Sequence, residues 1–329
     1  MEKGRRGVLC GAIASLVLTL AGATQVWAQQ AVYPNKPVKL IVPLPPGGGA
    51  DFLGRVLAEE LSKSMGQPFI VENRGGAGGS IGSNFVAQSA PDGYTLVFGY
   101  SASHSINPVI SKLPYDPLTD FSPVALVALA PNMLVVNPAL PVKSVVELIA
   151  LAKSKPGELR YASAGTGSAP HMSGELFNHM AGTTMLHVPY KGAAPALVDV
   201  MAGHLELTFT SLPAGLPHGK SGAVRMLGVT GSKRTSLLPD LPTIAESGLP
   251  GFDTDQWYGV LGPKNLPADV VATLNKAIVA ALKSPELIEK VKAQGFEISA
   301  SSPNGLAGHM RVETAKWKKL AADANIKID

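Results

Sequence analysis

Short apolar runs alternate with amphipathic segments along most of the chain. Residues 38–42, 69–72 and 94–98 are runs rich in β-branched and aromatic side chains, the pattern of strands buried within a sheet. A glycine-containing loop follows each run, and Phe52 and Val56 begin the helical hydrophobic pattern after the first loop. The repeated order of strand, loop and helix predicts a doubly wound α/β sheet with parallel strands.

A second series of the same kind begins near Met133. Its predicted elements follow in the order 142–153 (helix), 159–162 (strand), 170–180 (helix), 185–188 (strand), 195–201 (helix), 206–210 (strand) and 224–229 (strand). A last strand at 258–261 precedes three segments that begin with proline, which is favoured in the first turn of a helix: 267–282, 285–293 and 303–321. We therefore predict two lobes. Residues 29–130 and 256–329 form the first lobe, and residues 131–255 form the second.

The first 28 residues have the pattern of a secretory signal peptide. Lys3, Arg5 and Arg6 precede an apolar run at 8–23, and Val26-Trp27-Ala28 places small residues at the positions that a signal peptidase requires. The apolar run is shorter than the ~20 residues that span a bilayer. Since this segment also holds the one cysteine of the chain, we expect a free, periplasmic protein without disulfides.

Composition and charge exclude several classes of protein. The 329 residues include 35 Gly and 27 Pro, which is below the share seen in low-complexity chains. The signal segment carries three basic residues and one acidic residue, so its removal lowers the formal charge from +4 to +2. Because no run of Lys or Arg remains, neither nucleic acid nor an anionic membrane is an expected partner.

Two glycine-rich loops carry the strongest functional signal. The first is Leu44-Pro45-Pro46-Gly47-Gly48-Gly49-Ala50 and the second is Ser163-Ala164-Gly165-Thr166-Gly167-Ser168, each between a predicted strand and a predicted helix. Such turns leave backbone amides unpaired at the positive end of a helix dipole, so they attract carboxylate or phosphate without Lys or Arg. Glycines that only permit a tight turn would give the same pattern, so both interpretations stay open here.

Other chemistry has weaker support in the sequence. Neither loop matches a nucleotide-binding motif, and no Gly-x-Ser-x-Gly elbow is present. His171, Glu175 and His179 recur every four residues and therefore share a predicted helix face, which is one arrangement that holds a metal ion. The alternative to a binding protein is accordingly an exported hydrolase that uses His104 or His171, or a metal-dependent enzyme that uses His171, Glu175 and His179.

Several longer motifs resemble one family. They are Ile41-Val42-Pro43-Leu44-Pro45-Pro46-Gly47-Gly48, Val71-Glu72-Asn73-Arg74, Ala90-Pro91-Asp92-Gly93-Tyr94, His187-Val188-Pro189-Tyr190-Lys191-Gly192 and Leu238-Pro239-Asp240-Leu241-Pro242-Thr243. In this order they resemble the Bug family, the TctC-type periplasmic receptors of tripartite tricarboxylate transporters. The resemblance implies the type II periplasmic binding protein fold, with two lobes that close on a small carboxylate in the cleft between them.

The resemblance also implies a site. In such receptors the two glycine loops grip one carboxylate from opposite lobes, Ser101, His104 and Asn107 belong to a third loop, and residues 190–193 form a fourth. No cofactor or metal is expected. The predicted ligand-binding residues are Leu44, Pro45, Gly47, Gly48, Gly49, Ala50, Ser101, His104, Ser163, Ala164, Gly165, Thr166, Gly167, Ser168, Tyr190, Lys191 and Ser211.

Two departures from the family pattern bear on the ligand. Leu44 stands where relatives commonly have Phe, and Thr210 stands where many have Asp. Loss of that carboxylate removes a partner for a ligand ammonium group. We therefore expect a dicarboxylate without an amino group, with an aromatic one such as terephthalate within range. The expected receptor is a monomer that delivers its ligand to integral-membrane transporter subunits or to a sensor kinase.

Overall fold

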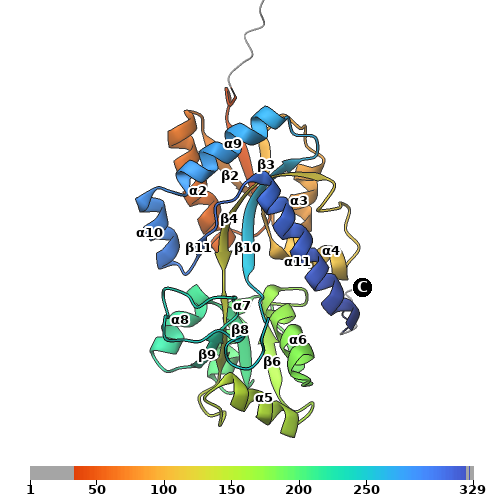
Figure 1. The fold of residues 1–329 in the computed structure, drawn as a ribbon, viewed down its shortest axis with the longest axis vertical. Helices are drawn as coiled ribbons and strands as arrows, with labels where there is room; N and C mark the ends of the chain where they lie inside the picture. The colour runs from red at the N-terminus through yellow and green to blue at the C-terminus, as the bar shows by residue number, and fades with distance from the viewer. Residues whose placement is uncertain (1–32, 324–325, 327–329) are drawn as a thin grey trace, which may run out of the picture.

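The computed structural model describes residues 33–323 and residue 326, so the predicted signal peptide lies outside the described residues. The chain forms two α/β lobes, one above the other along the longest axis of the molecule (Figure 1). Within the described ranges, no helix has the length and hydrophobicity needed to cross a membrane.

The first lobe is built on a six-stranded sheet with the order β11-β4-β10-β3-β1-β2. Its strands are β1 (Val38–Val42), β2 (Phe69–Asn73), β3 (Thr95–Tyr100), β4 (Phe121–Ala130), β10 (Gln256–Pro263) and β11 (Glu297–Ile298). Its helices are α2 (Gly49–Met65), α3 (Ser80–Ala87), α4 (Asn107–Ile110), α9 (Ala268–Ala281), α10 (Pro285–Ala293) and α11 (Pro303–Asp323). Short helical turns at Ala77–Gly79 and Ala102–Ile106 complete this lobe.

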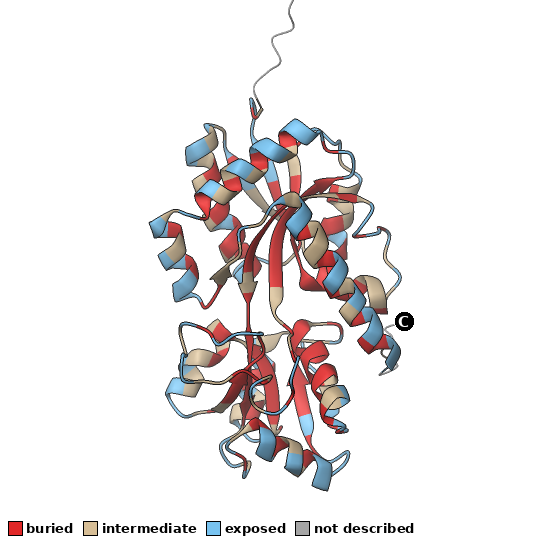
Figure 2. Cartoon of the chain, in the orientation of Figure 1, coloured by how far each residue is buried: buried red, intermediate tan, exposed pale blue. Residues whose placement is uncertain are grey.

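The second lobe is built on a five-stranded sheet with the order β7-β6-β8-β5-β9. Its strands are β5 (Asn132–Val136), β6 (Arg160–Ser163), β7 (Leu186–Pro189), β8 (Leu207–Ser211) and β9 (Arg225–Val229). Its helices are α5 (Val145–Ser154), α6 (Ala169–Ala181), α7 (Ala193–Met201) and α8 (Leu212–Lys220). Figure 2 shows buried residues along the strands of both sheets and exposed residues on the outer faces of the helices.

The prediction of purely parallel sheets is wrong, because each sheet contains a strand that enters from the other lobe. β1 pairs in parallel with β2 and β3, but β10 is antiparallel to both β3 and β4. In the second sheet β5 is antiparallel to β8 and β9. The chain crosses between lobes at Pro131, between β4 and β5, and returns just before β10. A strand that arrives by such a direct crossing can pair antiparallel with its neighbours.

Helix α8 and strand β4, which the sequence pattern does not predict, have weak local signals. α8 contains three Gly or Pro residues after its first turn, including Pro217 inside the helix, so its helix propensity is low. β4 is a ten-residue apolar run that carries Pro123. The prediction that proline marks the starts of the last three helices is confirmed. α10 and α11 begin at Pro285 and Pro303, and Pro267 is the N-cap of α9.

α11 contacts the hydrophobic cores of both lobes. Leu306 and Met310, near its start, pack in a cluster with residues of the first sheet, whereas Trp317 and Leu320 pack with Phe209 and other second-lobe residues. We propose the lobe division given by the two sheets, with residues 131–255 as the second lobe and α11 as a helix that bridges it to the first.

Replacement of Trp317 by Ala tests this bridging role. Trp317 is 1% exposed and its Nε1 donates to Glu313 Oε2 at 3.1 Å, so truncation leaves both a cavity and an unpaired carboxylate oxygen. We expect a loss of about 3–5 kcal/mol in the free energy of unfolding, measured in urea. Lys318→Ala, at an exposed position on the same helix, should change it by less than about 0.5 kcal/mol. Equal effects of the two changes would contradict the bridging role.

Candidate functional site

A cavity of about 880 Å³ lies between the lobes and is lined by residues from both. Its size falls in the range of roughly 300–1,000 Å³ that is usual for small-molecule sites. The first lobe contributes Leu44, Gly47–Ala50, Phe52, Gly78, Tyr100, Ala102, Asn107, Ala130, Gln256, Tyr258, Gln294 and Phe296. The second lobe contributes Asn132, Ala164, Thr166–Pro170, Ala193, Ser211, Pro213 and Ala214.

The first glycine loop leads directly into α2. The first backbone hydrogen bond of the helix runs from Phe52 N to Gly48 O at 3.0 Å, so the amides of Gly49, Ala50 and Asp51 have no carbonyl of their own helix to bond. Gly48 has extended dihedral angles, φ −89° and ψ 175°, and a Cβ built there would meet no atom within 4 Å. The start of this 17-residue helix is therefore open to the cavity at a position without a side chain.

Asp51 supports the first loop from behind. Its Oδ2 accepts from Gly47 N at 2.9 Å, and its Oδ1 accepts from Asn73 Nδ2 at 2.9 Å and from Arg55 Nη2 at 2.9 Å. Burial acts to raise the pKa of Asp51, but the hydrogen bonds from Arg55, Gly47 and Asn73 together hold it below its ordinary value. Asn73 Nδ2 also donates to Leu44 O at 3.1 Å, so an ionised, charge-paired aspartate fixes both ends of the loop.

The second glycine loop leads in the same way into α6. Ser168 caps the helix, because its Oγ accepts from His171 N at 3.4 Å and donates to Gly165 O at 2.6 Å. Gly165 and Gly167 have φ angles of +120° and +77°, which residues with a Cβ rarely adopt. Ala164, Thr166 and Gly167 line the cavity, and the loop therefore faces the first glycine loop across it.

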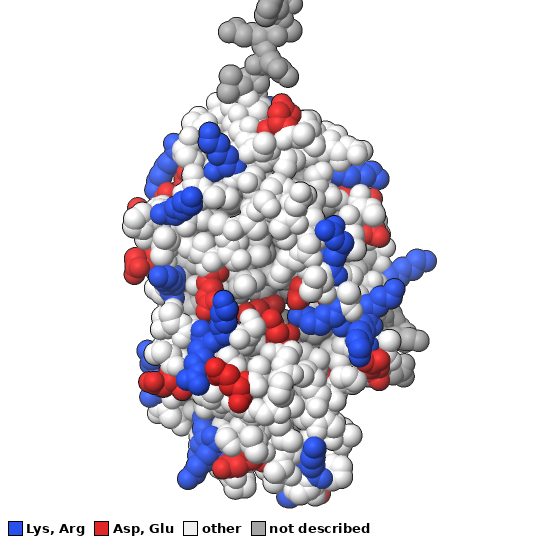
Figure 3. Space-filling view, in the orientation of Figure 1, with Lys and Arg blue, Asp and Glu red and all other residues white. Residues whose placement is uncertain are grey.

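Two more helices begin at the cavity wall. Ala193 is the first residue of α7, and Ser211, Pro213 and Ala214 surround the start of α8. Together with α2 and α6, four helix N-termini converge on one space, each with the positive end of its dipole. None of the described residues that line this space is charged. On the face shown in Figure 3, Lys and Arg side chains are scattered over both lobes with acidic groups among them.

Aromatic rings form one wall of the cavity on the side of the first lobe. Phe52 and Phe296 stack with ring centroids 6.2 Å apart, and Tyr100 and Tyr258 stack at 6.5 Å. Tyr258 also meets Phe296 edge to face at 5.8 Å, which joins the two pairs. This aromatic wall of Phe52, Tyr100, Tyr258 and Phe296, with Leu44 beside Phe52 in the lining, offers an apolar surface to a planar or aliphatic ligand body.

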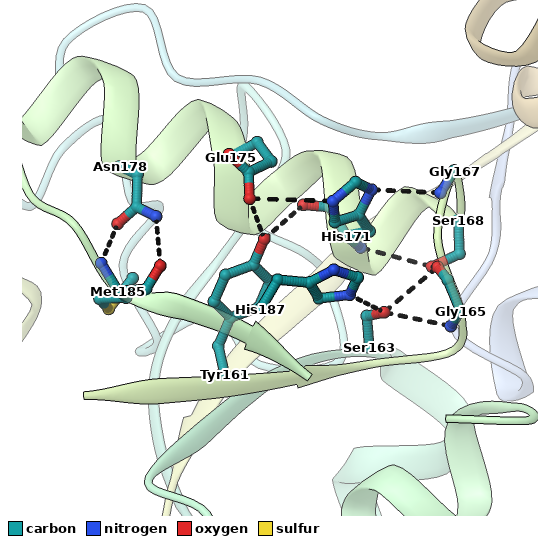
Figure 4. Close-up of polar contacts among 10 residues, drawn as sticks. All are labelled: Tyr161, Ser163, Gly165, Gly167, Ser168, His171, Glu175, Asn178, Met185 and His187. Atoms are coloured by element: carbon teal, nitrogen blue, oxygen red, sulfur yellow. Dashed lines mark hydrogen bonds and ion pairs between the residues drawn. The ribbon is translucent and has the colours of Figure 1, made fainter. Parts of the chain in front are cut away.

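A polar network lies beneath the second loop (Figure 4). His171 Nδ1 accepts from Gly167 N at 3.1 Å, and His187 Nε2 lies 2.6 Å from Ser163 Oγ. The two imidazole rings are 4.0 Å apart. Burial lowers the pKa of His171 to about 3, with a further contribution from His187, and burial lowers the pKa of His187 to about 4. Both rings are therefore neutral near pH 7.

Ser101 and His104 do not line the cavity, contrary to expectation. His104 has no exposed surface; its Nδ1 lies 2.8 Å from Ser103 Oγ, and its ring packs at 4.9 Å from Phe121. Burial lowers the pKa of His104 to about 3. The helical turn after β3 directs His104 into the core and brings Ala102 and Asn107 to the cavity in its place.

Five other predicted residues also lie outside the lining. Ser163 and Gly165 belong to the second loop but bond each other outside the cavity lining, and Pro45 is an exposed residue of the first loop. Tyr190 OH donates to Asp199 Oδ2, which holds that ring on α7, and Lys191 is exposed. The other ten predicted residues line the cavity: Leu44, Gly47, Gly48, Gly49, Ala50, Ala164, Thr166, Gly167, Ser168 and Ser211.

The proposed triad of metal ligands is not assembled. His171 Nε2 lies 3.8 Å from Glu175 Oε1, but His179 points to α11, where its Nε2 lies 3.5 Å from Asp323 Oδ2. Over residues 33–323 and 326, no group of three or more His, Cys, Asp or Glu side chains could hold a metal ion. The predicted metal site of His171, Glu175 and His179 is therefore wrong, because the His179 side chain faces α11 and not the other two residues.

Several lining residues have no recognisable signal in the sequence. Asn132 and Gln256 stand at the two crossings between lobes, and Gln256 Nε2 donates to Asn132 Oδ1 at 3.2 Å. Gln294 and Phe296 follow α10, far along the chain from the glycine loops. Tyr258 lines the cavity, whereas the neighbouring Trp257 is fully buried.

Similarity to known proteins identifies the family to which the chain belongs. The family model for the tripartite tricarboxylate transporter family receptor, TctC, matches residues 53–326. The chain belongs to this family. BugT of Bordetella pertussis is 38% identical to this receptor over 301 residues, which cover 90% of this chain and 91% of that protein. A protein encoded in the tcbD-tcbE intergenic region of Pseudomonas sp. strain P51 is 36% identical over 327 residues, or 99% of this chain and 96% of its own.

Solved structures of relatives share the fold. An R. palustris protein solved with adipate has a TM-score of 0.80 and 41% identity, and covers 90% of this receptor and 99% of its own chain. The periplasmic binding protein BugD has a TM-score of 0.77 and 34% identity, covering 90% and 99% of the two chains. MatC from Rhodopseudomonas palustris, with bound malate, has a TM-score of 0.76 and 32% identity, covering 88% and 99%. The predicted type II periplasmic binding protein fold is confirmed.

The buried neutral histidines predict a pH dependence of stability. The pKa values of His104, His171 and His187 lie below the ordinary 6.5 in the folded state, so below that pH the unfolded chain binds more protons than the folded one. The free energy of unfolding should therefore fall as the pH drops from 7 towards 4, by up to about 1.4 kcal/mol per group and pH unit.

Urea unfolding at pH 7, 6, 5 and 4.5 measures this dependence. His104→Phe should flatten the slope relative to the unaltered receptor, because one of the three groups is gone. The carboxyl of Asp255, whose pKa burial raises, opposes the slope in both proteins, so the comparison isolates the histidine. Identical slopes would contradict the assignment.

Proposed function

We propose that this receptor binds a small carboxylate in the interlobe cavity, in the periplasm, and presents it as a monomer to integral-membrane subunits of a tripartite tricarboxylate-type transporter or to a sensor kinase. The observation that carries the proposal is the convergence of four helix N-termini, those of α2, α6, α7 and α8, on a cavity with no charged residue among its described lining. The predicted signal peptide supports the periplasmic location.

The physical basis is electrostatic. Backbone amides of the first helical turn lack partners, and each helix adds the equivalent of about half a positive charge at its start. An anion placed between such termini accepts hydrogen bonds from both lobes and gains from every dipole. A cation would face four positive ends and no compensating carboxylate. The cavity therefore favours anions, and a carboxylate has oxygens on both sides for the two facing loops.

The lining also bears on which carboxylate is bound. With no acidic side chain among the described lining residues, a ligand ammonium group has no ionic partner, so amino acids are disfavoured. Thr210, which stands where an acid is common in relatives, is buried away from the cavity. The aromatic wall and Leu44 suit an apolar body. We propose a dicarboxylate without an amino group, with aromatic dicarboxylates such as terephthalate included; relatives have been solved with adipate and with malate.

The two crossings suit a receptor that opens and closes. Asn132 N donates to Thr230 Oγ1 at 2.8 Å, and Thr254 N donates to Thr230 O at 3.1 Å, so the crossing segments are bonded to one another. Rotation about them would move each glycine loop as a unit with its own sheet. A ligand that bonds both loops favours the closed form, which a membrane partner then recognises.

A thermal-shift panel tests the ligand class. Citrate, malate, succinate, adipate, benzoate, terephthalate, aspartate and glutamate are compared at equal concentration. A ligand at 100 times its Kd should stabilise the protein by about 2.7 kcal/mol, which raises the melting temperature measurably. We expect shifts with dicarboxylates that lack an amino group. A shift with aspartate or glutamate alone would contradict the proposed class, and no shift with any carboxylate would contradict the proposed function.

Gly48→Val tests the role of the α2 terminus. The extended backbone of Gly48 accepts a β-branched residue, and the new side chain meets no protein atom near its Cβ, so the fold should be retained. Its methyl groups would fill the space beside the helix start, and we expect the Kd to rise at least roughly tenfold. Gly308→Val on α11 is the matched control, since that glycine has equal free space but lies outside the lining. Unchanged affinity in Gly48→Val would contradict the site.

A further inference from the structure

The second glycine loop is held from beneath by two histidines on different elements. His171, on α6, accepts the Gly167 amide proton at Nδ1 over 3.1 Å. His187, on β7, approaches Ser163 Oγ to 2.6 Å through Nε2, and Ser163 Oγ accepts from Gly165 N at 3.1 Å. Figure 4 shows both rings on the same side of the loop, between β6 and α6. The amides on either side of Thr166 are thus occupied by side chains below the loop.

Thr166 is left as the apex of the loop. It lines the cavity, and its amide has no hydrogen-bond partner among the described residues. Gly165 O accepts from Ser168 N at 3.1 Å and from Ser168 Oγ at 2.6 Å, so the neighbouring carbonyl is also bonded within the loop. A loop whose Gly165 and Gly167 amides and Gly165 carbonyl are bonded internally presents the Thr166 amide to a ligand in a fixed position, which lowers the entropic cost of binding.

The geometry requires the His171 ring to be neutral, and burial keeps the His187 ring neutral near pH 7 by lowering its pKa to about 4. An Nδ1 atom that accepts from Gly167 carries no proton, and the Nε2 of the same ring then faces Glu175 Oε1 at 3.8 Å. Glu175 Oε1 in turn accepts from Tyr161 OH at 2.5 Å, and the Tyr161 ring stacks on His187 at 5.1 Å. With the two imidazoles 4.0 Å apart, two buried cations would repel each other strongly.

We propose that His171 and His187 are positioning residues for the carboxylate site: His171 fixes Gly167 as a neutral acceptor, and His187 fixes Gly165 through its hydrogen bond with Ser163, so that the Thr166 amide is held ready for the ligand. The inference rests on the proposed carboxylate function and adds residues that do not themselves touch the ligand. Neither histidine lines the cavity, so their role is to supply hydrogen bonds to the loop and not positive charge.

Variants that keep or remove the acceptor atom test the role of His171. In His171→Asn the amide Oδ1 replaces Nδ1, so the bond from Gly167 N can re-form; in His171→Leu it cannot. We expect the Kd for the carboxylates of the thermal-shift panel, measured by calorimetry, to rise at least roughly tenfold in His171→Leu and to stay within about threefold in His171→Asn. His171→Met serves in place of His171→Leu if the latter is too unstable to purify.

The same comparison applies to His187, whose Nε2 is mimicked by Gln Oε1. His187→Gln should retain affinity and His187→Leu should lose it. His179→Leu is the matched control, because His179 is on α6 but half-exposed and paired with Asp323. Equal losses in the Asn and Leu variants of His171, or wild-type affinity in His171→Leu at unchanged melting temperature, would overturn the proposal.

A measurement without ligand separates this proposal from the proposed function. In the ligand-free receptor, long-range ¹H–¹⁵N spectra should show His171 as the neutral Nε2–H tautomer at pH 6, and the Gly167 amide should exchange faster in His171→Leu than in His171→Asn. If the unaltered receptor binds none of the carboxylates, the proposed function fails while these signatures still report on the loop. A protonated His171, or equal Gly167 exchange in both variants, would overturn the positioning role.

Discussion

The unpaired backbone amides at helix starts are the constraint on which the site depends. Such groups need a partner, and a buried one left alone costs free energy. The receptor brings the starts of α2, α6, α7 and α8 to one interlobe cavity, where a ligand with acceptor oxygens, as proposed, would supply the missing partners. Because no described side chain in the lining is charged, the positive potential comes from the main chain, whose position is set by the fold itself.

Main-chain donors are useful only if their loops are rigid, and each lobe solves this differently. In the first lobe an ionised Asp51 bonds Gly47 and is neutralised by Arg55, so no net negative charge faces the anion. In the second lobe two neutral histidines hold the loop instead, His171 directly and His187 through Ser163. Both supports bond amides that precede the helix start, Gly47 in the first loop and Gly165 and Gly167 in the second.

Local features of the site could be predicted from the sequence, and those that depend on tertiary contacts could not. The Gly47–Ala50 and Ala164–Ser168 loops were found because a strand, a glycine turn and a helix are adjacent in the chain. The prediction that His104 faces the cavity differs from the structure, because the turn after β3 directs its ring towards Phe121. Hydrophobic periodicity does not reveal such a turn. Asn132, Gln256 and Phe296 meet the loops only after the chain has crossed between lobes twice, and the antiparallel β5 and β10 were missed for the same reason.

The free energies available from the helix termini and from apolar burial indicate which part of the cavity provides each kind of selectivity. A helix terminus contributes roughly 0.3–1 kcal/mol to an exposed anion and up to about 2 kcal/mol to a partly buried one. Four termini therefore provide at most about 8 kcal/mol, before the cost of desolvating the carboxylate, and a micromolar Kd alone needs about 8.2 kcal/mol. The remainder has to come from the ligand body, since apolar area buried on Phe52, Tyr100, Tyr258 and Phe296 yields about 25 cal/mol per Å². The helix termini thus select for an anion of any skeleton, and the aromatic wall discriminates between carboxylates.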